Sequence, residues 1–326
     1  MHVIITGGAG FLGGKLAQAL LARPTLMDGN GRPRTIERIT LVDVVTSPLS
    51  DPRVTSIAGD LADPALVARV LAQGADSVFH LAAVPSGGAE ADFDLGLRVN
   101  LDATRALLEA CRAQREPAKF VYASTCAVFG GPLPDPVPDS QALWPQSSYG
   151  NQKSIGEFLV NDYTRKGFVD GRSLRLPTIS VRPGKPNKAA SSFASGILRE
   201  PLAGADALCP VPGATRMWLS SPRAAIDNFI VAHDAPASAF AHTRSINVPG
   251  ISTSVDAMLA ALRRVAGDAV AARVTFREDD AIGRIVKSWP VDFDTVFARK
   301  LGMRADADFE SIVRQYVDDE LGGRIA

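Results

Sequence analysis

The sequence predicts an α/β fold in which a doubly wound parallel sheet is followed by a smaller C-terminal domain. Three observations support this fold class. Short apolar runs alternate with helical patterns over residues 1–180, as in consecutive βαβ units. A glycine-rich turn joins the first apolar run to the first helical pattern. The 326 residues correspond to roughly two domains of about 150 residues each.

The predicted elements follow one another in order. The six strands are residues 2–5, 39–42, 54–58, 77–81, 119–123 and 173–180. The four helices between them are residues 12–22, 64–72, 99–113 and 148–165. The polar stretch 25–34 predicts an exposed loop. Beyond residue 180 the pattern is less regular, so we assign 181–326 mainly to a substrate-binding domain, with a segment near 220–250 returning to the sheet.

The composition excludes several classes of protein. Because 35 Lys and Arg residues balance 35 Asp and Glu residues, nothing attracts a polyanion, and we expect no nucleic acid partner. No apolar run approaches the roughly 18 residues of a membrane helix, so no membrane partner is expected either. Three cysteines without metal-ligand spacing and four scattered histidines predict no metal site. These cysteines and an N-terminus unlike a signal peptide favour the cytoplasm.

The sequence TGGAGFLGG, which follows the first strand and opens the first helix, predicts a dinucleotide-binding turn. Gly7 and Gly10 permit the tight turn, and Gly13 permits close contact between helix and strand. Phe11 and Leu12 begin the helix, whose N-terminal N–H groups and positive potential attract a pyrophosphate. The cofactor site is therefore expected here.

Two acidic residues are expected at the adenosine end of the cofactor. Asp43 ends the second strand, where a carboxylate accepts the ribose hydroxyls and repels a 2′-phosphate, so NAD is favoured over NADP. It lies thirty residues after Gly13, and the polar insertion at 25–34 explains this long spacing. Asp60 could bond the adenine amino group, with Leu61 against the ring. The alternatives are a turn residue for Asp43 and a helix N-cap for Asp60.

Tyr149 and Lys153 form the candidate catalytic pair. Their spacing of four residues places them on one face of a helix. A phenol has a pKa of about 10, and a nearby ammonium favours the phenolate. The pair could thus exchange a proton with a substrate hydroxyl. Ser124 and Thr125 end the fifth predicted strand and add hydroxyl groups near the same place.

These motifs together make the chain resemble the extended short-chain dehydrogenases/reductases. TGGAGFLGG, GDLAD, VFHLAA, RVNLDATRALLEAC, FVYASTCAVFG and YGNQK stand in the order typical of that family, over residues 1–180. The resemblance implies a Rossmann-type NAD-binding domain in which Tyr149 is the acid/base, and Lys153 holds the nicotinamide ribose and tunes Tyr149. Thr125 or Ser124 would bond the reacting oxygen, and Asn100 would support a proton relay.

The same resemblance implies further cofactor contacts and an assembly. The segment Leu81, Ala82 and Ala83 would line the cofactor, as would Pro177 and Thr178. A homodimer would form through the two helices that carry residues 100–111 and 149–165.

The chain departs from the family's nucleotide-sugar enzymes in its substrate region. Thr178 stands where those enzymes have an Asn that helps bind the nucleotide diphosphate. The region instead offers cations, hydroxyls and an amide, namely Arg182, Lys185, Asn187, Lys188, Ser191 and, later, Arg223. Such groups suit a small sugar acid, although each cation could also be a surface charge or a structural ion pair.

VRPGKPNKAASSF and KSWPVDFD resemble the group of this family that oxidises the C2 hydroxyl of D-erythronate, a four-carbon sugar acid, to a 2-oxo acid with NAD. The alternative is a nucleotide-sugar epimerase or dehydratase with tightly bound NAD. A third reading, a non-catalytic dinucleotide sensor, is disfavoured because such sensors commonly lose the Tyr/Lys pair.

Overall fold

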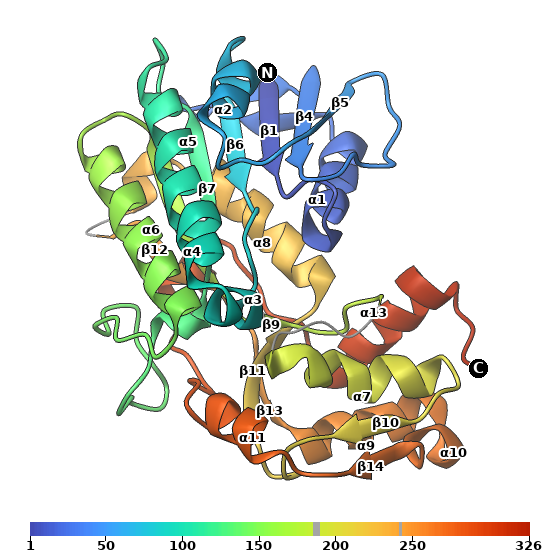
Figure 1. Ribbon diagram of the computed structural model, residues 1–326. Helices are drawn as coiled ribbons and strands as arrows, with labels where there is room; N and C mark the ends of the chain where they lie inside the picture. Colours follow the sequence, from blue (N-terminus) through green and yellow to red (C-terminus); the bar gives the residue numbers. More distant parts are fainter. Residues whose placement is uncertain (185–189, 241–242) are drawn as a thin grey trace.

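A seven-stranded parallel sheet is the centre of the computed structural model, which describes residues 1–184, 190–240 and 243–326 (Figure 1). Its strands lie in the order β12 (Ser245–Asn247), β8 (Asp170–Leu176), β7 (Lys119–Thr125), β6 (Ser77–His80), β1 (His2–Thr6), β4 (Arg38–Asp43) and β5 (Val54–Ala58). Every neighbouring pair is parallel. The direction of winding reverses between β1 and β6, so the predicted doubly wound α/β fold is confirmed.

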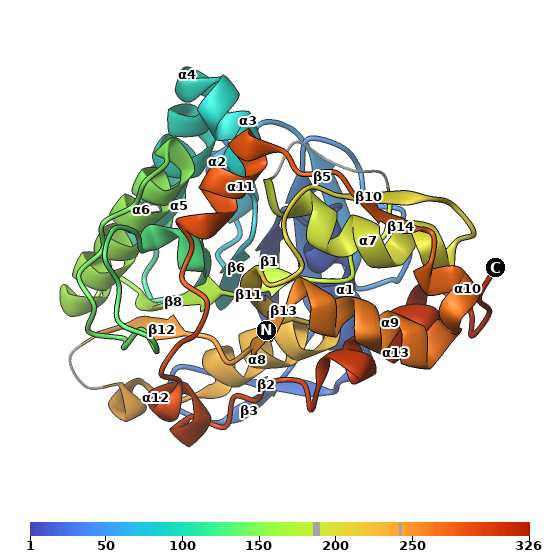
Figure 2. The same cartoon turned by 90° about the horizontal axis from the view of Figure 1, so that it is seen from below.

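Helices cover both faces of this sheet (Figures 1 and 2). One layer contains α2 (Pro64–Leu71), α5 (Ala103–Arg112) and α6 (Ser148–Arg165), and the other contains α1 (Phe11–Ala22) and α8 (Pro222–Asp234). Because both faces are covered, the central strands are buried, and all five residues of β1, including His2 and Thr6, lie away from water. The side chains of Asp63, Ser147 and Ser221 cap α2, α6 and α8 by accepting hydrogen bonds from first-turn N–H groups.

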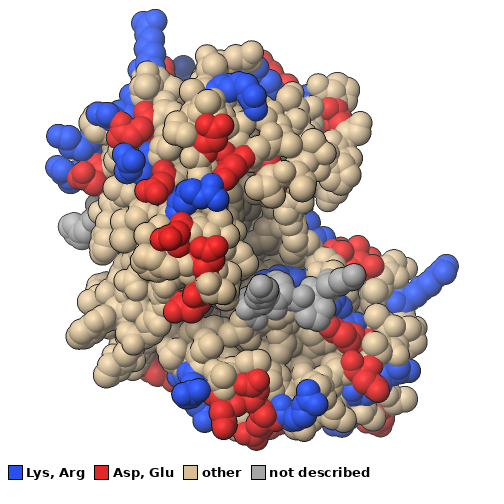
Figure 3. Space-filling model, viewed as in Figure 1, with Lys and Arg blue, Asp and Glu red and all other residues tan. Residues whose placement is uncertain are grey.

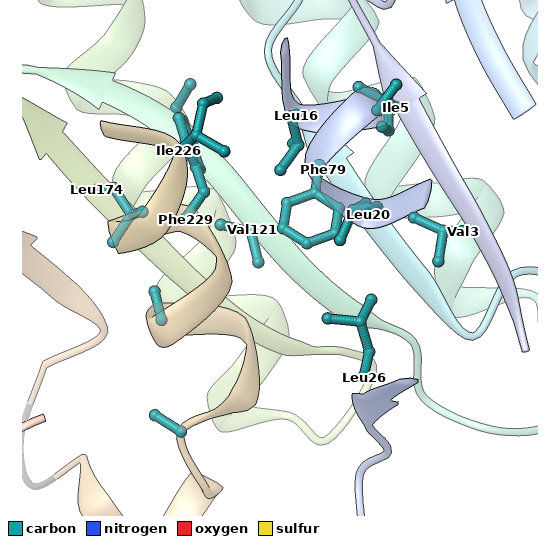
Figure 4. Close-up of a cluster of buried hydrophobic side chains, with 14 of the residues drawn as sticks. Val3, Ile5, Leu16, Leu20, Leu26, Phe79, Val121, Leu174, Ile226 and Phe229 are labelled. Atoms are coloured by element: carbon teal, nitrogen blue, oxygen red, sulfur yellow. The ribbon is translucent and has the colours of Figure 1, made fainter. Parts of the chain in front are cut away.

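One hydrophobic core lies between the sheet and the layer of α1 and α8 (Figure 4). Leu16 and Leu20 of α1 and Phe229 of α8 are fully buried against Phe79 of β6 and Val121 of β7. Each such side chain contributes about 1.5–3 kcal/mol by leaving water. This packing fixes the glycine turn before α1 relative to the carboxyl ends of the strands.

A smaller unit lies beside the carboxyl ends of the sheet (Figure 1). Its strands are β9 (Thr178–Ile179), β11 (Arg216–Ser220) and β13 (Ile251–Ser254) in one sheet, and β10 (Ala207–Cys209) with β14 (Val274–Phe276) in another. Its helices are α7 (Phe193–Leu202), α9 (Val255–Ala266), α10 (Asp268–Ala271), α11 (Asp280–Lys287) and α13 (Phe309–Leu321). Buried side chains such as Ile197, Met258 and Val313 form its own core.

The chain passes between the two units more than once. After β11 it returns to the large sheet as α8 and as β12, which pairs with β8 in parallel. It then enters the smaller unit again at β13. Helix α8 and strand β12 therefore lie with the large sheet, although residues of the smaller unit precede and follow them in the sequence.

Three predicted elements differ from the structure. The expected loop at 25–34 contains an antiparallel hairpin of β2 (Thr25–Met27) and β3 (Pro33–Thr35), and its buried side chain is Leu26. The strand predicted at 173–180 is divided at Pro177, because proline cannot donate a ladder hydrogen bond. The helix predicted at 99–113 starts with the π-helical turn η1 (Leu97–Asp102) before α5.

Short elements complete the chain. They are α3 (Ser86–Ala91), α4 (Phe93–Gly96), η2 (Cys126–Val128), η3 (Ala190–Ser192), η4 (Ala237–Ala239) and α12 (Val296–Lys300). All three cysteines are buried and free. Among the described helices, none is both long and apolar enough to cross a membrane.

Candidate active site

The glycine turn between β1 and α1 forms one wall of the candidate site. Gly7 has a φ of +70°, which favours glycine, and a Cβ added there would lie 2.9 Å from the backbone nitrogen of Ala82. A Cβ on Gly13 would lie 2.0 Å from the carbonyl oxygen of Gly7, so the first turn of α1 packs directly on the loop. Both glycines are therefore required by close backbone approach.

The start of α1 fits a pyrophosphate. Gly10 is its N-cap and offers no side-chain cap to the first N–H groups of the helix, at Phe11 and Leu12. Such uncapped donors, beside a glycine loop and at the positive end of a helix, suit the phosphates of a dinucleotide. The residues present thus fit NAD at the predicted place.

Asp43 and Asp60 lie at the carboxyl ends of β4 and β5. The half-buried Asp43 carboxylate accepts hydrogen bonds from the backbone N–H groups of Ala9, at 3.0 Å, and Val44, at 2.7 Å. It therefore stands against the glycine turn, as a ribose ligand should. Asp60 pairs with Arg98 and accepts from the N–H of Ala62, which lowers its pKa. The cap of α2 is Asp63 instead, and Leu61 is buried.

The segment after β6 is held on both sides. The N–H groups of Leu81 and Ala82 donate to the carbonyl and the hydroxyl of Thr6. Asn100, fully buried in η1, both donates to and accepts from the backbone of Val84. Half-buried Ala83 lies between these anchors, so the predicted cofactor-lining segment adjoins the glycine turn.

Asn100 also contacts α6, the helix that carries Tyr149 and Lys153. Its Nδ2 donates to Oε1 of Gln152 on α6 at 2.8 Å. The Asn100 side chain therefore joins three elements by hydrogen bonds, namely η1, the loop after β6 and α6. The π-helical turn supplies the local change in helical phase at this residue, as such turns often do at functional sites.

Tyr149, Lys153 and Thr125 come together at the carboxyl end of β7. Lys153 Nζ donates to the carbonyl of Ala123 at 2.9 Å and lies 4.6 Å from the ring centroid of Tyr122 and 5.9 Å from that of Tyr149. The Thr125 hydroxyl lies beside the phenol of Tyr149 and lowers its pKa. Tyr149 and Lys153, the predicted catalytic pair, therefore lie together with the predicted hydroxyl of Thr125.

The protonation of this pair differs from the sequence-based expectation. Burial raises the pKa of Tyr149 to about 12, and the opposing effects of Arg182 and Thr125 do not cancel that effect. Burial lowers the pKa of Lys153 to about 7, although the Glu157 charge acts in the opposite direction. The net pKa of the phenol is therefore higher than expected, because burial removes water from both groups and outweighs the influence of neighbouring charges.

Ser124 and Thr125 have different surroundings. The Ser124 hydroxyl is buried and donates to Oε1 of Glu157 at 2.5 Å, whereas Thr125 faces Tyr149. The Ser124 hydroxyl is therefore bound by Glu157 in this structure, and Thr125 is the hydroxyl placed beside Tyr149. Glu157 was not among the predicted residues, although its position four residues after Lys153 places it on the same face of the helix.

Arg182 is the predicted substrate cation that the structure brings to Tyr149. The guanidinium charge favours the phenolate and so acts to lower the pKa of Tyr149, against the larger effect of burial. Its backbone is fixed by hydrogen bonds to the side chains of Ser195 and Arg199. In the described ranges no carboxylate pairs with this half-buried guanidinium.

A hollow lies between the two units of the chain (Figure 3).

Other predicted substrate residues have different outcomes. Arg223 is exposed on α8 and binds Asp319 of α13, with Nε 3.0 Å from Oδ2, so the alternative of a structural ion pair holds for it. Ser191 is half-buried in η3. Lys185, Asn187 and Lys188 lie outside the described residues.

The junction of β8 and β9 carries the remaining predicted contacts. Pro177 is buried between the two strands. Thr178 is half-buried and pairs with Leu219 of β11, at the boundary of the two units.

Comparison with known proteins gives a consistent set of relatives. The profile described as the NAD dependent epimerase/dehydratase family matches residues 3–219. The chain is 53% identical over 320 residues to D-erythronate dehydrogenase of Cupriavidus necator, covering 98% of each chain. It is 45% identical to D-erythronate dehydrogenase of Haemophilus influenzae, covering 98% of this chain and all of that protein. A solved structure described as a nucleoside-diphosphate-sugar epimerase from Agrobacterium tumefaciens superposes with a TM-score of 0.94 at 41% identity, covering 100% of this chain and 96% of that one.

Proposed function

Because the chain belongs to the NAD-dependent epimerase/dehydratase family, we propose that it is a dehydrogenase that oxidises the C2 hydroxyl of D-erythronate with NAD. Two relatives named for this activity, 53% and 45% identical over nearly the whole chain, support the proposal. The observation that carries it is the half-buried Arg182 beside Tyr149. A cation there would bind a carboxylate close to the base, which a sugar acid supplies.

NAD would be held by the glycine turn, the uncapped start of α1 and Asp43, and when bound it accepts the hydride from C2. Tyr149 takes the proton of the C2 hydroxyl, and Thr125 holds the oxygen in place. Lys153 stabilises the phenolate by its charge. Arg182 fixes the carboxylate and thereby selects the neighbouring carbon for oxidation.

The pH dependence follows from the Tyr149 and Lys153 pair treated as one unit. Burial lowers the pKa of Lys153 to about 7, so above that pH the pair holds one proton fewer. Phenolate with ammonium and phenol with amine contain the same number of protons. The reactive form is therefore available above about pH 7, and kcat/KM for oxidation is expected to rise with pH through this value.

The functional test compares two assays on the purified protein. NADH formation is followed with D-erythronate and other four- to six-carbon aldonic acids, beside conversion of a UDP-hexose without net NADH. The second assay is included because the Agrobacterium tumefaciens relative is described as a nucleoside-diphosphate-sugar epimerase. NADH formation with D-erythronate is the expected result. If the protein converts the UDP-hexose and forms no NADH with any of the acids, it is an epimerase and not a dehydrogenase.

Arg182→Met is expected to raise the KM for D-erythronate by about 30- to 1000-fold, because a buried charge-assisted contact with the carboxylate is lost. NADH formation is measured against erythronate concentration, with erythritol as a substrate that lacks the carboxylate. Arg223→Met serves as the matched control, since its guanidinium binds Asp319. If Arg182→Met and Arg223→Met change the KM equally, Arg182 does not bind the carboxylate.

The proposal includes a homodimer that works in the cytoplasm. Two large apolar side chains on α6, Ile155 and Phe158, are 41% and 62% exposed and lie three residues apart on one face. A second copy of α5 and α6 would cover them.

Phe158→Asp is expected to convert the dimer to a monomer, measured by light scattering. Phe276→Asp, at a similarly exposed phenylalanine of β14, is the control. A wild-type protein that is already monomeric contradicts the dimer.

A further inference from the structure

We propose that Glu157 is a positioning residue of this enzyme, which fixes the end of β7 and faces Lys153 with a negative charge. The inference deepens the proposed dehydrogenase function and rests on it. Glu157 lies one helical turn beyond Lys153 and two turns beyond Tyr149 on α6. Its side chain is only 1% exposed, which is rare for a carboxylate unless it is paired.

Three consecutive residues of β7 meet three residues of α6. The Ala123 carbonyl accepts from Lys153, the Ser124 hydroxyl donates to Glu157, and Thr125 stands beside Tyr149. The strand end is thus held against the helix at each successive position. Since Thr125 is the residue that presents its hydroxyl to the reacting oxygen, the Glu157 contact at the preceding position sets where that hydroxyl lies.

Arg175 compensates the buried charge of Glu157. It donates to both carboxylate oxygens, with Nε–Oε2 and Nη2–Oε2 distances of 3.0 and 2.8 Å and a longer Nε–Oε1 distance of 3.1 Å. Arg175 stands opposite Ser124 in the β7–β8 register. Its Nη1 also donates to the backbone carbonyl of Asp139 at 3.1 Å. A buried carboxylate whose oxygens are occupied in this way is held in one position.

The same network reaches the last strand of the sheet. Asn247 of β12 accepts a long hydrogen bond from Arg175 at 3.4 Å and donates to the carbonyl of Val137. Its own N–H donates to Asp139. Glu157 therefore links the catalytic helix to the loop at 137–139 and to three neighbouring strands.

The charge of Glu157 is the one carboxylate that acts on Lys153 within the described part of the chain. On α6 the other neighbour is the phenol of Tyr149, and on β7 the neutral ring of Tyr122 lies under the ammonium. On β6, burial lowers the pKa of His80 to about 3, so this imidazole is neutral. Removing the Glu157 charge therefore leaves no carboxylate among the described residues to oppose the desolvation of Lys153.

The decisive variant is Glu157→Gln. The amide nitrogen must face either Arg175, which can only donate, or Ser124, whose hydroxyl would then have to accept instead of donate. Either orientation disrupts the present contacts, so kcat is expected to fall by about 10- to 100-fold. The ammonium loses its stabilising charge, so the rise of kcat/KM with pH is expected to move down by about one pH unit. In protein labelled at lysine Cε with ¹³C, the Lys153 resonance should titrate at the same lower pH without substrate or NAD.

Two further variants separate position from charge. Ser124→Ala keeps the carboxylate and should lower kcat by about three- to tenfold without moving the titration to lower pH. Glu310→Gln removes a carboxylate from exposed ion pairs with Arg264 and Arg314, and should change neither quantity. If Glu157→Gln does not fold, Glu157→Asp takes its place and should lower kcat while keeping the wild-type titration.

The outcomes distinguish this inference from the proposed function. Folded Glu157→Gln with wild-type kcat and wild-type Lys153 titration overturns the positioning role, as does full activity in both Ser124→Ala and Glu157→Asp. Wild-type protein that forms no NADH from D-erythronate defeats the function, whereas the Lys153 titration still reports on the geometry.

Discussion

Replacement of Tyr149 by phenylalanine is expected to lower kcat for D-erythronate oxidation by about a thousandfold, with the affinity for NAD nearly unchanged. The phenolic oxygen is the group placed to take the C2 hydroxyl proton, and a positioned acid or base contributes about 10²- to 10⁴-fold. The ring itself remains in the variant, so the walls of the cofactor site keep their shape. NADH formation measures the first quantity, and titration of intrinsic fluorescence with NAD measures the second.

Tyr163→Phe is the matched control for this variant. Tyr163 lies on the same helix, but its hydroxyl donates to Glu109 of α5. Its loss should leave kcat and the pH profile as they are. A Tyr149→Phe enzyme with activity close to that of the control would show that another group accepts the proton.

Replacement of Gly13 by alanine is expected to weaken NAD binding by at least about tenfold and to lower the free energy of unfolding by about 1–3 kcal/mol. The added Cβ would lie 2.0 Å from the carbonyl oxygen of Gly7 and 2.9 Å from the Cα of Gly8. Since these are backbone atoms, the turn itself must move. The same movement displaces the N–H groups at the start of α1 from the phosphates.

The neighbouring glycine provides a control of opposite sign. A Cβ on Gly14 would have no atom within 4 Å, and alanine is favoured over glycine inside a helix by about 1 kcal/mol. Gly14→Ala should therefore keep NAD affinity and raise stability. Urea unfolding and NAD titration of both variants test the pair. Equal behaviour of Gly13→Ala and Gly14→Ala would remove the steric argument for the turn.

Much of the fold could be predicted because periodicity and turn residues agree along the first half of the chain. The strand at 54–58 and the helix at 148–165 have the predicted bounds. The hairpin at 25–35 could not be predicted, because its strands are short and its stability depends on one buried residue, Leu26. Propensity is a weak guide where tertiary contacts decide.

The candidate site shows the same limit. Motif residues that lie far apart in the sequence, such as Gly7 and Ala82, are brought into contact as the resemblance implied. The sequence could not distinguish Ser124 from Thr125, since adjacent hydroxyls differ only in which neighbours they meet after folding. Glu157 could not be predicted, because a glutamate on a helix is usually solvated. Its burial depends on the fold, which brings Arg175 of β8 against it.

The return of the chain to the large sheet as α8 and β12 has a consequence for how this protein can be divided. A fragment that ends near residue 180 would lack α8 and β12, leaving β8 as a bare edge and an apolar sheet face open to water. Such a fragment should aggregate rather than bind NAD as a module. Exchange of substrate specificity between relatives therefore has to be made by individual substitutions, because no single crossover point separates the cofactor half from the substrate half.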